Sequence, residues 1–127
     1  MMTTELLFMT TGRVVFGLFF LVAGLRNFAG FADWKTRLTN YGWPLPLAVL
    51  AAGFALQVIC GLALIFGYGT QAATWTLILF IVLATALFHN LFLFKDKERD
   101  PHLYLTLVNI TLISGLLMII GMDQAGL

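Results

Sequence analysis

The polar side chains that could do chemistry stand inside long apolar runs of this sequence. An arginine within the apolar layer of a membrane costs roughly 2.5 kcal/mol or more, so Arg13 needs a partner, a wet cavity or a route to the headgroups. Amide, hydroxyl, thiol and imidazole groups in such runs are expected to point inward, where they can hold a polar ligand. We predict Arg13, Gln57, His89 and Asn109 as ligand-binding residues, supported by Asn27, Cys60, Thr85 and His102.

The same residues offer little for catalysis. No acidic residue lies inside any predicted membrane span, which excludes a pair of carboxylates acting as acid and base. Two histidines and one cysteine do not give metal-ligand spacing, so we predict no metal site. A haem held by both histidines is a geometric alternative, because both lie toward one predicted membrane face. The pattern favours a binding or scaffolding protein over an enzyme acting alone.

Composition places the chain in a membrane. It has 127 residues, 61% of them hydrophobic and 10% charged, with a mean hydropathy of +0.96. These values lie outside the range of soluble domains. The formal net charge of +1 argues against nucleic acid as a partner.

Four apolar runs are long enough to cross a bilayer. We predict spans at about 6–28, 45–66, 72–94 and 101–121 in one domain of residues 1–127. Asp100 followed by Pro101 is typical of a helix start. The expected fold is an all-α, polytopic four-helix bundle.

One face of the first span is expected to pack against protein. Arg13, Gly17, Phe20, Gly24 and Asn27 recur at helical spacing and share one stripe. Small residues in that stripe allow close helix approach, which drives association in lipid. The second span carries small pairs of the same kind, which suggest a central helix or an oligomer contact: Ala48 with Ala52, and Ala51 with Ala55.

Between the first two spans lies a segment too polar to cross. Phe31, Trp34, Leu38 and Tyr41 fall on one helical face, which predicts a short amphipathic helix in the membrane interface. A connecting helix packed over the bundle mouth is an equal alternative.

The distribution of positive charge predicts the topology. Arg26, Lys35, Arg37, Lys95, Lys97 and Arg99 all fall in the first and third connections. By the positive-inside rule, these two charged loops are cytoplasmic and both termini lie outside, as expected for a multi-pass protein of a bacterial inner membrane.

Estimates of depth, at about 1.5 Å per helical residue, sort the inward polar groups into two sets. Arg13 and Gln57 are expected at similar depth nearer the termini, whereas His89, Asn109 and their neighbours gather near the cytoplasmic mouth. This arrangement predicts a polar pocket inside the bundle. Simpler readings stay open: Gln57 and Asn109 joining helices, His89 at the interface, His102 in solvent, and Arg13 reaching the headgroups.

Several motifs together resemble the DoxX family of small four-helix bacterial membrane proteins. They are Arg13 opening the first span, AGLRNFAGF at its end, YGWPLP, LQVICGLALIFG, FHN and LVNITLISGLLMI. The resemblance implies a four-helix bundle in the cytoplasmic membrane, joined to a redox partner or contacting quinone. Many members carry a glutamate where Gln57 stands, and an amide cannot pair with Arg13 as an ion or relay a proton.

Three hypotheses follow. The first is an accessory membrane subunit of a quinone-linked oxidoreductase, which binds a quinone or lipid-like molecule, with Arg13 and Gln57 holding its polar head. The second is a carrier for a small solute, with a water-accessible path past Arg13 and His89. The third is a scaffold whose small-residue faces assemble a homo-oligomer or bind a partner redox subunit, surrounded by membrane lipid.

Overall fold

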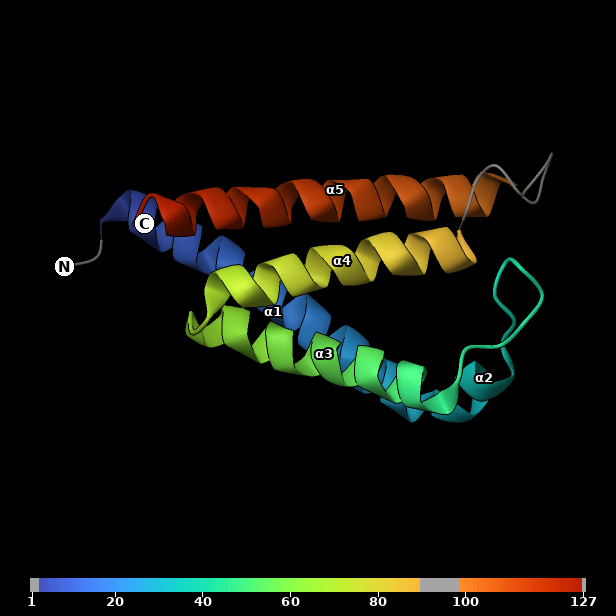
Figure 1. The fold of residues 1–127 in the computed structure, drawn as a ribbon. Coiled ribbons are helices and arrows are strands. Elements are labelled where there is room, and N and C mark those ends of the chain that lie inside the picture. Colours follow the sequence, from blue (N-terminus) through green and yellow to red (C-terminus); the bar gives the residue numbers. More distant parts are fainter. Residues whose placement is uncertain (1–2, 90–98, 127) are drawn as a thin grey trace.

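The computed structural model describes residues 3–89 and 99–126, which form five helices (Figure 1). They are α1 (Thr4–Ala29), α2 (Phe31–Thr36), α3 (Leu47–Phe66), α4 (Thr70–Phe88) and α5 (Arg99–Gln124). All except α2 are long and apolar enough to cross a membrane. The predicted all-α bundle of four membrane-spanning helices is therefore confirmed, and both termini lie at the same end (Figure 1).

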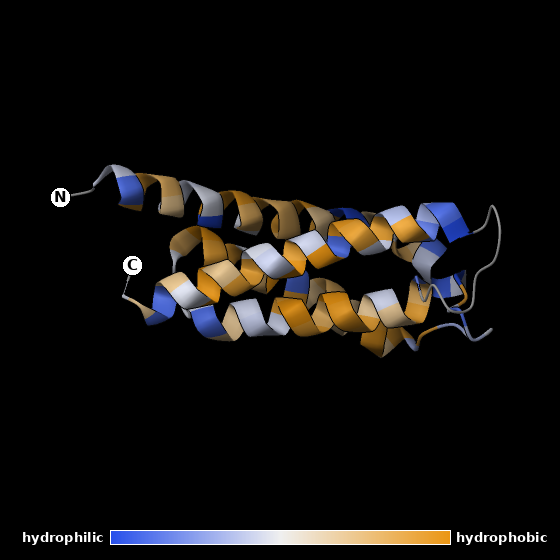
Figure 2. Ribbon diagram, turned by 90° about the horizontal axis from the view of Figure 1, so that it is seen from above, coloured by the Kyte–Doolittle hydropathy of each residue, from blue (hydrophilic) through white to orange (hydrophobic). Residues whose placement is uncertain are grey.

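The helix boundaries differ from the predicted spans mainly around the third connection. Helix α4 ends at Phe88, and the last part of the predicted third span, like Lys95 and Lys97, lies outside the described residues. Helix α5 begins at Arg99, which places Asp100 and Pro101 inside its first turn. Hydrophilic segments gather near the helix ends, and the helices between are largely hydrophobic (Figure 2).

Helices α1 and α3 run side by side at very close range. Gly17, Phe20 and Gly24 are buried on the predicted stripe of α1, whereas Val15, Leu18, Phe19 and Val22 are exposed. A Cβ added to Gly61 would lie 2.7 Å from the backbone nitrogen of Leu21 and 2.8 Å from the carbonyl oxygen of Gly17. Such distances leave no room for a side chain, so glycine is what permits this helix pair.

Helix α3 also packs on α4, and α4 packs on α5. The core between them is apolar and includes Phe20, Cys60, Leu64, Leu77 and Leu116. Helices α1 and α5 are not among the closely packed pairs in the described part of the chain. Between them, the ring of Phe16 reaches across to Gly115.

The predicted amphipathic helix is present but shorter than its apolar face suggested. Helix α2 ends at Thr36, and Arg37 is already extended. Thr39 donates its backbone N–H to the carbonyl of Trp43 at 2.9 Å, next to an isolated bridge between Leu38 and Pro44. Placing Leu38 and Tyr41 on a helical face was therefore wrong, because this local hairpin satisfies the backbone groups that a longer helix would have used.

Candidate functional site

A polar cavity of about 470 Å³ opens at the end of the bundle away from the termini. Its wall is made by the end of α2, the following loop, the end of α4 and the start of α5. The residues that line it are Trp34, Arg37, Leu38, Thr39, Asn40, Phe88, His89 and His102. We call it the mouth pocket.

The loop that roofs the mouth pocket is tied to α4. Asn40 donates its backbone N–H to the carbonyl of Leu87 at 2.7 Å and its side-chain amide to the carbonyl of Ala86 at 3.3 Å. Because the last carbonyls of a helix have no partner within the helix, these bonds cap α4 and fix the loop over it. The alternative of a connecting element packed over the bundle mouth therefore describes this segment well.

Aromatic rings position Arg37, the charged side chain among the described residues that line this pocket. The guanidinium of Arg37 lies 4.0 Å from the centre of the Trp34 ring, a cation–π contact. Trp34 in turn meets Phe88 edge to face at 5.4 Å and Phe54 at 5.7 Å between ring centres. Among the described residues, no hydrogen-bond acceptor is bound to Arg37, so its N–H groups are available to a ligand.

The two histidines meet at the same pocket. Nδ1 of His89 lies 2.8 Å from Nδ1 of His102, so one imidazole donates and the other accepts. Burial, and next the neighbouring His102, lower the pKa of His89, because both disfavour a positive charge there. The direct contact leaves no room for an iron between these nitrogens, and the haem alternative has no support from this geometry.

Below the histidines, hydroxyl and amide groups join α4 to α5. Thr106 donates to the carbonyl of His102 at 2.7 Å and lies 3.3 Å from that of His89. One turn further in, the amide of Asn109 donates to Thr85 Oγ1 at 2.9 Å. Asn109 and Thr85 thus bond to each other between the helices, as the simpler reading of Asn109 expected.

An apolar groove adjoins the mouth pocket on the side of α3 and α4. It encloses about 480 Å³, and Trp34 and Phe88 line both cavities. Its other walls are almost entirely hydrocarbon and include Val49, Ala52, Phe80, Leu83 and Leu87, with Asn27 at one edge. The polar mouth pocket and the apolar groove therefore meet at the rings of Trp34 and Phe88.

At the opposite end, Arg13 points inward to the end of α3. Its Nη1 donates to the carbonyls of Leu64 and Ile65, the latter at 3.4 Å. Gly67, which ends α3 with a positive φ of 68°, lies against the guanidinium. Arg13 therefore caps the negative end of the α3 dipole and is level with the α3–α4 turn.

Arg13 and Gln57 do not share a site, contrary to the estimate of equal depth. Gln57 is only 6% exposed, and its Oε1 accepts a hydrogen bond from Asn27 at 2.8 Å. The glycine contacts set the antiparallel register so that Gly17 opposes Gly61 and Gly24 lies against Gln57. Arg13 is eleven residues before Gly24, about 16 Å along the helix, so it meets the end of α3 instead.

Cys60 lies in the apolar core and lines neither the mouth pocket, nor the apolar groove, nor the small cavity beside Arg13. Together with Phe20, Leu64 and Leu77, Cys60 forms the apolar core that lies between the two ends of the molecule. Of the predicted site residues, the structure brings together Thr85, His89, His102 and Asn109 along α4 and α5. It places Arg13 alone at the far end.

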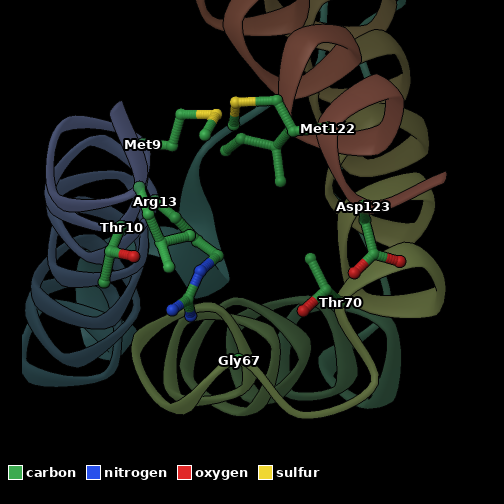
Figure 3. Close-up of a pocket in the computed structure, with 9 residues that line it drawn as sticks. Met9, Thr10, Arg13, Gly67, Thr70, Met122 and Asp123 are labelled. Atoms are coloured by element: carbon green, nitrogen blue, oxygen red, sulfur yellow. The ribbon is translucent and has the colours of Figure 1, made fainter. Parts of the chain in front are cut away.

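Sequence reasoning missed three residues that matter in this geometry. Trp34 and Arg37 had been assigned to an interfacial helix and a charged loop, although their spacing of three residues could have suggested a stacked pair. Asp123 lies across a small cavity from Arg13 (Figure 3). The sequence signal that could have identified Asp123 is that it lies on the same predicted side of the membrane as Arg13.

Four apolar helices with a buried small-residue interface and cavities at both ends define a polytopic membrane protein. The family model named DoxX matches residues 8–90, and the chain belongs to the DoxX family. No curated protein and no solved structure matches the chain.

Proposed function

We propose that this chain is an accessory membrane subunit of a quinone-linked redox system, which binds a quinone or similar lipid-like molecule at the mouth pocket. One observation carries the proposal: the polar pocket and the apolar groove meet at Trp34 and Phe88. A molecule with a polar ring and a long apolar tail matches that division. The redox assignment comes from the resemblance to family members associated with membrane oxidoreductases.

The polar side of the pocket suits a head with carbonyl oxygens. Arg37 carries N–H groups without a partner among the described residues, and His89 lines the same chamber. Both can donate to carbonyl oxygens, and the Trp34 ring can stack on a flat head. A bound quinone would supply electron and proton transfer; the chain would orient the head and shield it from water.

The apolar side suits an isoprenoid-like tail. Its lining is hydrocarbon from α3 and α4, which are lipid-facing on this side: Val49, Leu79 and Leu83 are about half exposed. A tail can therefore enter sideways from the bilayer without crossing a polar surface. Lipid-like ligands are bound in this way, whereas a water-soluble solute gains little from such a wall.

A carrier function finds less support in this arrangement. Between Arg13 and His89 the described interior is filled by the apolar core around Phe20, Leu64 and Leu77. A polar solute would have to cross that apolar layer, and the amides of Asn27 and Gln57 nearby are already bonded to each other.

The proposal includes an orientation in a bacterial inner membrane. Arg26, Lys35, Arg37 and Arg99 lie at the end with the mouth pocket, away from both termini. The positive-inside rule then puts the mouth pocket on the cytoplasmic side and the termini outside. We propose that a partner redox subunit binds on the cytoplasmic side.

The test is the quinone content of the protein purified from its native membrane. We expect quinone to co-purify with the unmodified chain and to fall about tenfold in Trp34→Leu. That substitution removes a ring contact and the cation–π contact, together worth about 1.4 kcal/mol. Trp75→Leu is the matched control, because Trp75 is half exposed on α4 and lines neither cavity.

Equal quinone in all three proteins, or none in the unmodified chain, would overturn the binding proposal. The accessory role is tested separately by quinol-dependent oxygen consumption of membrane vesicles with and without the chain. Unchanged oxygen consumption would overturn the proposed accessory role.

A further inference from the structure

The cavity at the terminal end has a different chemistry from the mouth pocket. It has a volume of about 160 Å³ and lies between α1, the α3–α4 turn and α5 (Figure 3). One water needs about 10–15 Å³, so the cavity holds a polar group larger than a single water. We call it the outer pocket.

One wall of the outer pocket carries a positive charge with free donors. The hydrogen bonds of Arg13 both come from Nη1, so Nε and Nη2 have no partner among the described residues. A guanidinium has five N–H donors and suits phosphate oxygens, which accept two at once. Capping α3 therefore uses only some of the hydrogen-bond donors of Arg13.

The other wall carries a negative charge in an unfavourable place. Asp123 lies in the last turn of α5, where a carboxylate is opposed by the helix dipole and no basic residue in that turn offsets it. It faces the cavity from the side opposite Arg13, and the described structure contains no ion pair between them. Asp123 is exposed, so a cation can reach it from the solvent and offset the opposing dipole.

The outer pocket lies between two helices that are each long and apolar enough to cross a membrane. Met9 and Met122 flank it from α1 and α5, the two helices that are not closely packed (Figure 3). Arg13 is level with the α3–α4 turn, where the membrane headgroups are expected. An acyl chain could run down the outside of α1 and α5 while its headgroup enters the cavity.

We infer that the outer pocket binds the phosphoethanolamine headgroup of a membrane lipid. Its phosphate lies against Nε and Nη2 of Arg13, and its primary ammonium donates to the carboxylate of Asp123. The headgroup thereby joins α1 to α5 at the terminal end, where Phe16 against Gly115 is the contact between these two loosely packed helices described above. This site is independent of quinone binding at the mouth pocket.

Lipid retention measured by native mass spectrometry from mixed vesicles tests the inference. The vesicles contain equal amounts of phosphatidylethanolamine, phosphatidylglycerol and phosphatidylcholine. We expect the unmodified chain to retain the ethanolamine lipid about tenfold over the other two, the factor that a charge contact of about 1.4 kcal/mol produces. The glycerol lipid has no ammonium, and the choline lipid has no N–H to donate.

Asp123→Asn is the decisive variant, because it leaves the Arg13 cap on α3 intact. We expect it to lose the preference for the ethanolamine lipid over the glycerol lipid. Glu5→Gln is the matched control: Glu5 is an exposed carboxylate at the same end and does not line the cavity, so the preference should stay. Equal retention of the three lipids by the unmodified chain, or the same preference in Asp123→Asn, would overturn the inference.

A competition arm distinguishes lipid from a free zwitterion. Soluble phosphoethanolamine offers the same charges without acyl chains. If it binds as tightly as the lipid, the lipid assignment is overturned, because the acyl chains beside α1 and α5 then contribute nothing.

Discussion

In the α1–α3 pair, Gly17 and Gly61 bring two backbones into contact. The α4–α5 pair is instead joined near its open end by side-chain hydrogen bonds, in which Asn109 donates to Thr85 and Thr106 donates to the carbonyl of His89. Backbone contact fixes one register and tolerates no added atom. Side-chain bonds can lengthen or exchange partners at modest cost. The difference indicates that α1 and α3 form the fixed half of the bundle, and that the mouth pocket borders the adjustable half.

The most severe way to break this comparison is to add one methyl group at the glycine contact. Gly61→Ala should lower the free energy of unfolding by about 3 kcal/mol, because its Cβ would clash with backbone atoms that cannot move aside. Titration with a denaturing detergent, followed by circular dichroism, measures the change. Gly121→Ala is the control, since nothing lies within 4 Å of the added Cβ there. Similar stability of the two variants would mean that α1 and α3 are not held at this distance.

A second test sharpens the comparison by removing one amide from each pair. Asn27→Leu leaves the buried Oε1 of Gln57 without its donor and should cost about 2 kcal/mol. Asn109→Leu should cost only about 0.6 kcal/mol, because the Thr85 hydroxyl still donates to the carbonyl of Ile81 at 2.7 Å. Both are measured by the same detergent titration. Equal losses of stability in the two variants would show that the α1–α3 and α4–α5 helix pairs tolerate an unpaired polar group equally well.

The smallest expected effect is a dependence on pH at the α4–α5 end. The pKa of His89 is lowered in the folded chain, so the unfolded chain binds more protons between that lowered pKa and the ordinary value of 6.5. Stability should therefore fall as pH drops through 6.5 and level off below the lowered pKa. Burial of His89 is the larger cause of this lowered pKa, and the neighbouring His102 is the second.

Unfolding midpoints of the unmodified chain and of His89→Gln, compared between about pH 5 and pH 8, measure this effect. We expect a flatter profile in His89→Gln. A profile with the opposite slope would contradict the direction of the pKa shift.

Several parts of the fold could be predicted because they depend on neighbouring residues. Span length and apolar content identified four membrane helices, and helical spacing identified the buried stripe of Gly17, Phe20 and Gly24. The segment after the first span was predicted only in part. Its helical periodicity continued to Tyr41, but a hairpin held by Thr39 and Trp43 replaced the helix after Thr36.

The candidate site could be predicted only in part. Depth estimates placed His89, His102 and Asn109 near the same mouth of the bundle, and the structure shows His89 in contact with His102. The hydrogen bond of Asn109 to Thr85 in particular was not predicted. The partner of Arg13 was not predictable in this way, because it is a pair of backbone carbonyls that carry no signature in sequence.

The sequence by itself determined that this chain crosses a membrane four times, with its charges at the ends and small residues on one face of the first span, since hydropathy and helical period are local properties. Only the tertiary structure decided which polar groups meet. The register between α1 and α3 depends on glycine contacts between residues more than forty positions apart, such as Gly17 and Gly61. That register separates Arg13 from Gln57 and places Arg13 against the end of α3. Trp34 and Arg37 meet in the mouth pocket because the loop after α2 folds back onto the end of α4.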